Sequence, residues 1–197
     1  MGRWEPNTRA RLERAALALF AEQGYDATTV AEIADRAGLT KSTFFRHYTD
    51  KREVLFGSQD VLAELFAEAI AAVPPEATTT DCLAAVLAVA ATLFTPERHD
   101  LAVQRRLAIE ANSDLQERQL LKRARLSAAV TDALLARGAD VTTAHLAGEM
   151  GILAFGAAYR RWAATGNELP YIEIAHVVLA DLRACAVRIG AEAGVSV

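Results

Sequence analysis

The chain has 197 residues, of which 52% are hydrophobic, and a net charge of −4 at neutral pH. This length and apolar content allow a sizeable core and exclude extended disorder, and the negative charge argues against indiscriminate binding to nucleic acid. Abundant Ala and Leu, with only 11 Gly and 5 Pro, favour helices. Charged residues interrupt each apolar stretch before it reaches membrane-spanning length, so we expect no membrane partner.

The apolar residues recur with a helical period, and all five prolines fall where helices would begin or end. We therefore predict an all-α fold of nine helices. Their approximate ranges are 7–23, 30–37, 41–48, 50–73, 80–93, 96–110, 114–137, 142–165 and 171–190.

The second and third helices carry clear start signals. Thr29 and Glu32 have the spacing of a capping box at the start of the second helix. Gly38 favours a tight turn after it, and Thr40 is expected to cap the third helix. A helix, a short turn containing Gly and another helix are the layout of a helix-turn-helix.

The third helix is predicted to have two different faces. Phe44 and Tyr48, four residues apart, would lie on the buried side. The opposite side carries Lys41, Ser42, Phe45 and Arg46. An exposed phenylalanine between cations favours a partner that is both apolar and anionic, and duplex DNA offers thymine methyl groups and phosphates together. Residues 1–53 carry a net charge of +1, so the basic groups are concentrated where such a partner would bind.

Residues 16–56, ALALFAEQGYDATTVAEIADRAGLTKSTFFRHYTDKREVLF, resemble the DNA-binding domain of the tetracycline-repressor (TetR) family of transcriptional regulators. The segments that carry the resemblance are LFAEQGYDATTV, IADRAGLTKSTFFRHY and DKREVL. The resemblance implies a nine-helix TetR-like fold, with a helix-turn-helix domain over residues 1–49 and a helical ligand-binding and dimerisation domain over 50–197. It also implies a set of DNA-contacting residues: Thr29, Thr40, Lys41, Ser42, Thr43, Phe45, Arg46, His47 and Lys51.

Within this set, the resemblance assigns different partners to different residues. Lys41, Ser42, Phe45 and Arg46 would face the major groove, with Thr43 beside them. Thr29, Thr40, His47 and Lys51 would hold the phosphate backbone. An N-terminal arm, formed by Arg3, Arg9 and Arg11, would either reach the DNA or be solvated.

A single helix-turn-helix makes few contacts, so such domains usually bind two half-sites as dimers. The last two helices are apolar on most sides, and family members pair these helices with those of a second subunit. The predicted interface residues are Gly148, Gly151, Phe155, Ile174, Val178 and Leu182, with burial inside one subunit as the alternative.

The resemblance also implies that the intervening helices surround a small, largely apolar effector. Large apolar residues are the candidates to line its site: Leu65, Phe66, Leu93, Phe94, Leu107, Phe155, Tyr159 and Trp162. Each of these could instead be an ordinary core residue.

Together these features predict a cytoplasmic, homodimeric, ligand-responsive regulator, in particular a repressor released from a palindromic DNA operator by its effector. An activator or a ligand-independent regulator of the same fold is an alternative, as is an all-α carrier or enzyme. No catalytic constellation or phosphate loop supports an enzyme, and we expect no cofactor. His145 and Glu149, four residues apart, are interpreted as a helical pair rather than a metal site. Cys82 and Cys185 are expected to be reduced thiols.

Overall fold

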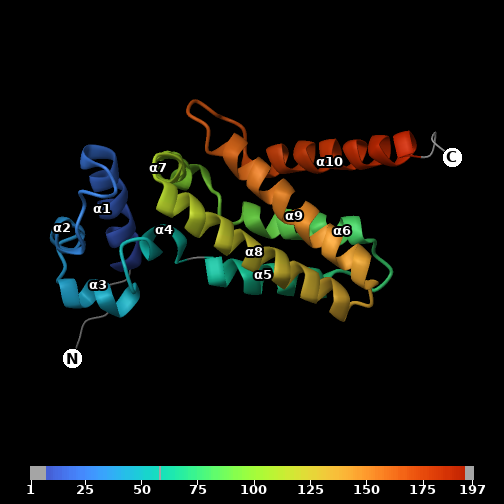
Figure 1. Cartoon of the computed structure of the whole chain (residues 1–197), viewed down its shortest axis with the longest axis horizontal. Coiled ribbons are helices and arrows are strands. Elements are labelled where there is room, and N and C mark those ends of the chain that lie inside the picture. The colour runs from blue at the N-terminus through green and yellow to red at the C-terminus, as the bar shows by residue number, and fades with distance from the viewer. Residues whose placement is uncertain (1–7, 58, 194–197) are drawn as a thin grey trace. The chain divides into compact units, whose positions relative to one another are not determined.

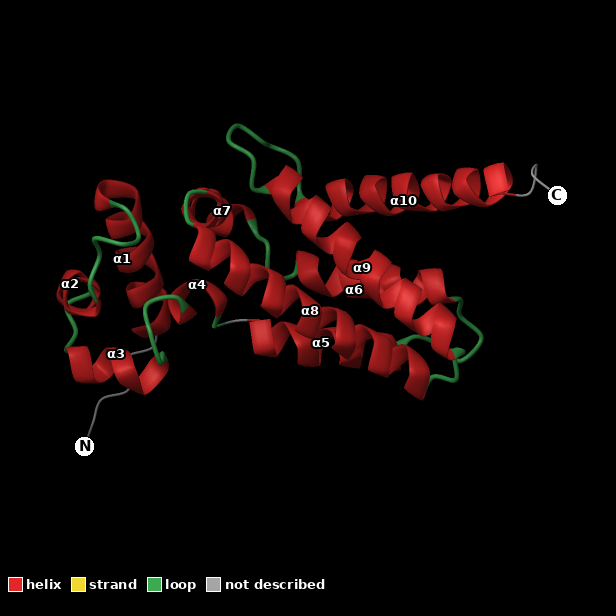
Figure 2. Cartoon of the chain, in the orientation of Figure 1, coloured by secondary structure: helices red, strands yellow, loops and turns green. Residues whose placement is uncertain are grey.

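The computed structural model describes residues 8–57 and 59–193, and within these ranges it contains helices and no strand (Figure 2). Nine helices of seven or more residues in the described ranges confirm the predicted all-α, nine-helix fold. They are α1 (Thr8–Gln23), α2 (Val30–Arg36), α3 (Lys41–His47), α5 (Gln59–Ala72), α6 (Thr79–Ala91), α7 (His99–Glu110), α8 (Ser113–Ala136), α9 (Val141–Trp162) and α10 (Tyr171–Ala193). A four-residue helix, α4 (Glu53–Phe56), and a 3₁₀ helix (Pro96–Arg98) accompany them.

The single helix predicted over residues 50–73 is two helices, α4 and α5. The backbone N–H of Gly57 closes α4 by donating to the carbonyl of Glu53 at 2.7 Å. A Cβ at Gly57 would lie 2.9 Å from Cε1 of Tyr48, so the chain passes this ring too closely for a side chain. The apolar period continues through the break, and periodicity therefore predicted one helix.

The chain divides into two compact units, one of residues 1–59 and 100–122 and the other of residues 60–99 and 123–197. The core of the first unit contains α1 to α4, for example Leu12, Ile33 and Phe44, together with Ile109 of α7 and Leu115 of α8. Segment 100–122 therefore completes the core on which the helix-turn-helix rests. The functional boundary predicted after residue 49 stays a prediction, because compactness alone does not assign function.

Helices α2 and α3, two short helices of the first unit (Figure 1), each begin at a capping threonine. The hydroxyl of Thr29 accepts from the N–H of Glu32 at 3.2 Å, and the Glu32 carboxylate accepts from the N–H of Thr29 at 2.7 Å. This is the predicted capping box. The hydroxyl of Thr40 accepts from the N–H of Thr43 at 3.1 Å. Between the two helices, Gly38 adopts a φ of +64°, which glycine reaches without a steric penalty.

The second unit is built around α9, which packs against α10 and α6. Two glycines permit its close approach to neighbouring helices. A Cβ at Gly148 would lie 2.2 Å from the hydroxyl oxygen of Thr131 in α8, and a Cβ at Gly151 would lie 2.7 Å from Cδ2 of Leu83 in α6. Both glycines are therefore required by packing within the subunit.

The second half of α10 has a different environment from the first. Residues 183–191 are all exposed, whereas Tyr171, Ile174 and Val178 near the beginning are buried. In the described ranges no single helix combines the length and apolar character needed to cross a membrane, although the bent pair Thr79–Ala91 and Pro96–Glu110 would pass by length and composition alone.

Candidate nucleic-acid interface and effector region

Helix α3 has the two faces that its sequence predicts. Phe44 is fully buried and Tyr48 is 8% exposed, and their rings pack at 5.6 Å between centroids. On the opposite face the side chains are exposed: Lys41, Ser42, Phe45 and Arg46. The buried face fixes the orientation of the helix, and the exposed face is free to meet a partner.

Phe45 is the unusual member of the exposed face, because half of its surface is in contact with solvent. Its ring lies edge-on to that of Phe44, with centroids 5.5 Å apart. The ammonium of Lys41 lies 6.0 Å from the Phe45 ring centroid, at the limit of a cation–π contact. A cation and an apolar ring therefore stand side by side on the surface.

Hydroxyl groups at the start of α3 organise the neighbouring arginine. The hydroxyls of Thr40 and Thr43 are 2.9 Å apart, within hydrogen-bond distance. Arg46 Nη2 donates to the Thr43 hydroxyl at 2.9 Å. The guanidinium is thus held along the exposed face of the helix in the free chain, where it keeps further N–H donors.

Lys51 is placed differently from its prediction. Its ammonium donates to the carbonyls of Tyr25 at 2.7 Å, Asp26 at 3.2 Å and Thr28 at 2.9 Å. It also lies 4.2 Å from the centroid of the Tyr25 ring. An ammonium has three N–H donors, and here all three point at the loop that precedes Thr29. Lys51 therefore has a structural role in that loop, and its predicted phosphate contact stays a prediction.

The predicted N-terminal arm is also used within the first unit. Arg11 donates through Nε and Nη2 to the carbonyl of Ala37, at 3.0 and 2.6 Å, and holds α1 against the turn before α3. The guanidinium of Arg9 lies 6.0 Å from the Tyr48 ring centroid. Arg3 lies outside the described residues.

Two carboxylates near α2 are kept ionised by specific donors. Hydrogen bonds from the hydroxyl and N–H of Thr29 hold the pKa of Glu32 below its ordinary value. The guanidinium of Arg36 lowers the pKa of Glu22 in the same way. Because the hydroxyl of Thr29 also donates to Glu32 at 2.8 Å, its proton is engaged in the free chain.

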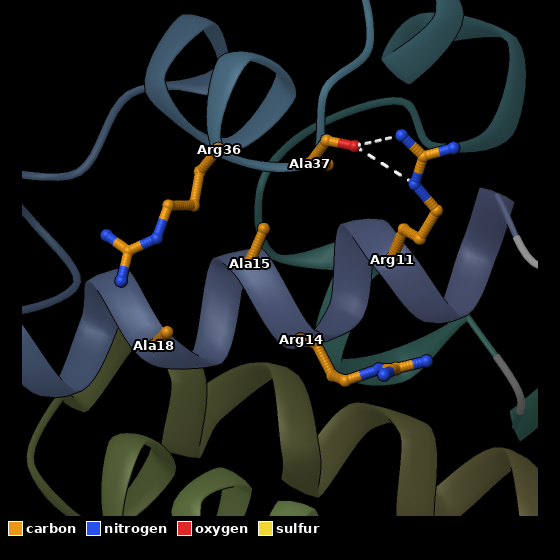
Figure 3. A pocket seen from close by; sticks show the side chains of 6 residues that line it. All are labelled: Arg11, Arg14, Ala15, Ala18, Arg36 and Ala37. Atoms are coloured by element: carbon orange, nitrogen blue, oxygen red, sulfur yellow. Dashed lines mark hydrogen bonds between the residues drawn. The ribbon is translucent and has the colours of Figure 1, made fainter.

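A pocket of about 290 Å³ lies between α1 and α2. It is lined by Arg11, Arg14, Ala15, Ala18, Arg36 and Ala37. Figure 3 shows the Arg11 guanidinium turned toward the Ala37 carbonyl. Arg36 makes a bidentate contact with Glu22, at 2.9 and 2.5 Å. Two of the three guanidinium groups are therefore part of the scaffold, and we assign the pocket no role in binding.

Partly buried ion pairs attach segment 100–122 to the first four helices within the first unit. Glu53 of α4 accepts from Nε of Arg118 at 2.9 Å and lies 3.6 Å from the ammonium of Lys122. Lys122 is 2% exposed. A second pair joins Arg105 of α7 to Glu13 of α1. Charges removed from water in this way are stable only with their partners in place.

The second unit gathers five of the predicted effector-binding residues into one aromatic cluster. The ring of Phe94 lies 5.9 Å from that of Phe155, 5.1 Å from that of Tyr159 and 5.3 Å from that of Trp162, measured between centroids. Phe66 joins the cluster through Phe155, at 5.4 Å. These distances are those of favourable ring contacts.

The three leucines predicted with them are placed otherwise. Leu65 and Leu93 are half-buried. Leu107 belongs to the first unit and is 49% exposed. Leu107 is therefore removed from the candidate effector site.

Two members of the cluster were not predicted from the sequence. The ring of Tyr171 lies 4.9 Å from that of Phe94, and the ring of His99 lies 5.4 Å from that of Trp162. His99 Nε2 is 2.9 Å from the carbonyl oxygen of Trp162. Tyr171 follows Pro170 at a helix start, so an aromatic residue in the first turn was the available signal.

The predicted dimer interface is corrected, because four of its six residues are buried within the subunit: Gly148, Gly151, Ile174 and Val178. Phe155 belongs to the aromatic cluster, and Leu182 is half-buried. Helices that are apolar on most sides have more than one candidate face, and periodicity selected the face that packs internally. Large apolar side chains are instead exposed at Leu146 and Leu153 of α9 and at Val177, Val187 and Ile189 of α10.

The described residues contain no group of three His, Cys, Asp or Glu side chains arranged to hold a metal ion. Glu149 accepts a hydrogen bond from the hydroxyl of Ser127 at 2.7 Å and so links α9 to α8. Both cysteines are free thiols, Cys82 buried and Cys185 exposed.

Residues 13–57 match the family described as bacterial regulatory proteins, tetR family. The HTH-type transcriptional regulator TcmR of Streptomyces glaucescens is 43% identical over 63 residues, which are 32% of this chain and 28% of TcmR. The HTH-type transcriptional repressor KstR2 of Mycobacterium tuberculosis is 43% identical over 47 residues, 24% of each chain. The chain thus matches about a quarter of the length of these relatives.

The similarity to solved structures extends further along the chain. The crystal structure of FadR from Thermus thermophilus, a TetR-family repressor in complex with lauroyl-CoA, covers 88% of this chain and 92% of its own, with 24% identity and a TM-score of 0.54. At this identity the likeness concerns the fold, and it confirms the predicted TetR-like architecture.

Proposed function

Because the chain belongs to the tetR family of bacterial regulatory proteins, we propose that it is a homodimeric DNA-binding regulator that represses transcription. A small, largely apolar effector releases it from a palindromic operator. It acts in the cytoplasm, where it meets the DNA. The observation that carries this proposal is the exposed face of α3, where cations, a hydroxyl and an aromatic ring stand on a helix anchored by Phe44 and Tyr48.

The exposed residues of α3 suit the major groove. Lys41 and Arg46 are donors for guanine and phosphate oxygens, Ser42 is a short donor or acceptor, and Phe45 can contact a thymine methyl group. Thr29, Thr40, Thr43 and His47 are proposed to contact the backbone around them. Lys51 acts indirectly, by holding the loop that presents Thr29.

Repression is favoured over activation by the relatives named as repressors, KstR2 and FadR. Transcript levels of the adjacent genes test the direction of control. Deletion of the gene that encodes this chain is expected to raise them. A fall would identify an activator, and no change under any condition would contradict regulation of these genes.

The second copy of the chain is proposed to cover the exposed apolar residues of α9 and α10. The exposed second half of α10 supports this placement, because a helix that carries Val187 and Ile189 in solvent needs a partner surface. Sedimentation of Leu153→Glu should give a monomer. Leu169→Glu is the matched control and should remain dimeric, since Leu169 lies in the loop before α10 and is even more exposed than Leu153.

The effector is proposed to bind in the second unit, at the aromatic cluster around Phe94. A ligand shifts the DNA-binding equilibrium only if it binds the released state more tightly than the DNA-bound state. FadR was solved with lauroyl-CoA, and the apolar acyl chain of that ligand supports an effector with a large apolar part for a protein of this fold.

A binding titration tests the DNA-reading face. A labelled duplex from upstream of the gene is titrated with the wild type, with Lys41→Ala and with Arg125→Ala, which removes an exposed cation of α8. Loss of affinity is expected for Lys41→Ala alone, by about tenfold. Equal losses in both variants would mean that α3 contributes no more than general charge.

A further inference from the structure

Tyr171 is the first residue of α10 and is 1% exposed. Its ring packs between Phe94, at 4.9 Å, and Trp162, at 6.2 Å between centroids. Its hydroxyl is buried and has no hydrogen-bond partner among the described residues. A phenylalanine would make the same ring contacts without burying a polar atom, so the hydroxyl is unfavourable for the stability of the free chain.

The groups around Tyr171 offer its hydroxyl little. The carbonyl of Trp162 already lies 2.9 Å from His99 Nε2 and accepts from Asn167 Nδ2 at 3.1 Å. Phe94, its second ring neighbour, has only π-faces and C–H edges to present. The hydroxyl is therefore satisfied only by a group that enters the cluster.

The rings also indicate how such a group would enter. Tyr171 and Trp162 are buried, but Phe94, Phe155 and Tyr159 are only partly buried and form the accessible side of the cluster. A planar ring inserted there would replace contacts among the rings of the cluster with contacts between those rings and the ligand. Burial raises the pKa of the Tyr171 hydroxyl, which therefore remains protonated and acts as a donor.

We propose that the Tyr171 hydroxyl donates a hydrogen bond to an acceptor oxygen of a neutral aromatic effector that inserts among Phe94, Tyr159 and Trp162. The ligand class is thus an aromatic ring system that carries a carbonyl or ether oxygen. A charged group would lose its hydration in this surrounding, which selects against ionic ligands. This inference rests on the ligand-responsive function proposed above and names the chemistry of its site.

A pair of probes with the same shape tests the hydrogen bond. 2-Acetylnaphthalene carries a carbonyl where 2-ethylnaphthalene carries a methylene group. Affinities are obtained from the rise in unfolding temperature with probe concentration, followed by circular dichroism. The wild type should bind the ketone about fivefold more tightly than the hydrocarbon. Tyr171→Phe should bind the two equally, and Tyr25→Phe, which removes a hydroxyl from the first unit instead, is the matched control that should keep the difference.

The unfolding temperature of the free variant gives a second, independent readout. Tyr171→Phe should unfold at the same or a higher temperature than the wild type, since it removes an unpartnered hydroxyl. A lower temperature would mean that the hydroxyl has a partner in the free chain, and would overturn the proposal. So would equal binding of the two probes by the wild type, or binding of neither.

Failure of this inference is distinguishable from failure of the proposed function. Lauroyl-CoA, the ligand of the T. thermophilus FadR structure, is added to the complex with upstream DNA in parallel. Release by lauroyl-CoA without discrimination between the naphthalenes would overturn the aromatic class and retain ligand response. A fivefold preference that depends on Tyr171, without any effect on the DNA complex, would retain the binding site and contradict its role in regulation.

Discussion

In the first unit the aromatic side chain proposed to meet a partner, Phe45, stands on the surface beside a cation, whereas in the second unit the aromatic rings proposed to meet an effector pack against one another. DNA is reached by rigid docking, so its contacts must be exposed in advance and held by a buried scaffold. A small apolar ligand is reached by insertion, so its contacts can be closed until it arrives. The same residue types therefore serve two kinds of recognition, and burial distinguishes them.

The largest difference is expected between single substitutions of the two adjacent phenylalanines of α3. Phe44→Ala removes a fully buried ring and should lower the free energy of unfolding by about 3–5 kcal/mol. Phe45→Ala should leave stability nearly unchanged and weaken binding to upstream DNA. Urea unfolding and DNA titration of both variants measure this. Similar stability losses in the two would contradict the division of α3 into scaffold and reading faces.

The partly buried ion pairs of the first unit should have the next largest effect. Glu53→Ala leaves Lys122 and Arg118 without this carboxylate and should lower the free energy of unfolding by about 3 kcal/mol. Glu22→Ala breaks the exposed pair with Arg36 and should change stability little. Thermal unfolding compares the two. If the Glu53 variant is as stable as the wild type, segment 100–122 is not held to α4 in this way.

Alanine variants of two lysines, Lys51 and Lys41, should then distinguish a residue that supports the fold from a residue that contacts DNA. Lys51→Ala should lower the free energy of unfolding by about 1.5 kcal/mol, because three backbone carbonyls lose a charged donor. It should weaken DNA binding without changing its salt dependence. Lys41→Ala should do the reverse, with unchanged stability and a different salt dependence. A shallower salt slope for Lys51→Ala would restore its predicted phosphate contact.

The smallest effect is expected at the capping box, as a dependence on pH. The folded chain holds the pKa of Glu32 below its ordinary value of 4.5, so ionised Glu32 stabilises the fold above that pH. This contribution is lost as the pH falls through the lowered pKa. Glu32→Gln should therefore unfold at a lower temperature than the wild type at neutral pH, and the two should converge in acid. A difference that persists in acid would show that charge is not its cause.

The sequence predicted the first unit well because its signals are local. Thr29, Glu32 and Thr40 act within one helical turn, and the spacing of Phe44 and Tyr48 fixes which face of α3 is buried. The completion of this core by Ile109 and Leu115 could not be predicted in the same way. Those residues are distant in sequence, and an ordinary apolar period carries no sign of its partner.

The second unit shows the limit of periodicity more plainly. Gly148 and Gly151 were predicted to admit a second subunit, yet they admit Thr131 and Leu83 of the same chain. Small residues indicate a close approach without identifying the approaching helix. Likewise, a lysine in a DNA-binding motif predicts a hydrogen-bond donor without identifying the acceptor. Only the three-dimensional structure reveals that the ammonium of Lys51 donates to backbone carbonyls of the same chain.

The exposed face of α3 is proposed to bind DNA, and the salt dependence of binding is the decisive measurement. Anisotropy of a labelled upstream duplex is measured between about 50 and 200 mM KCl for the wild type and for the double variant Lys41→Ala, Arg46→Ala. The logarithm of the affinity should fall linearly with the logarithm of the salt concentration, with a slope that is shallower by about two in the variant if both cations meet phosphates. Absence of salt-dependent binding by the wild type, or the same affinity and slope in both proteins, would contradict the claim.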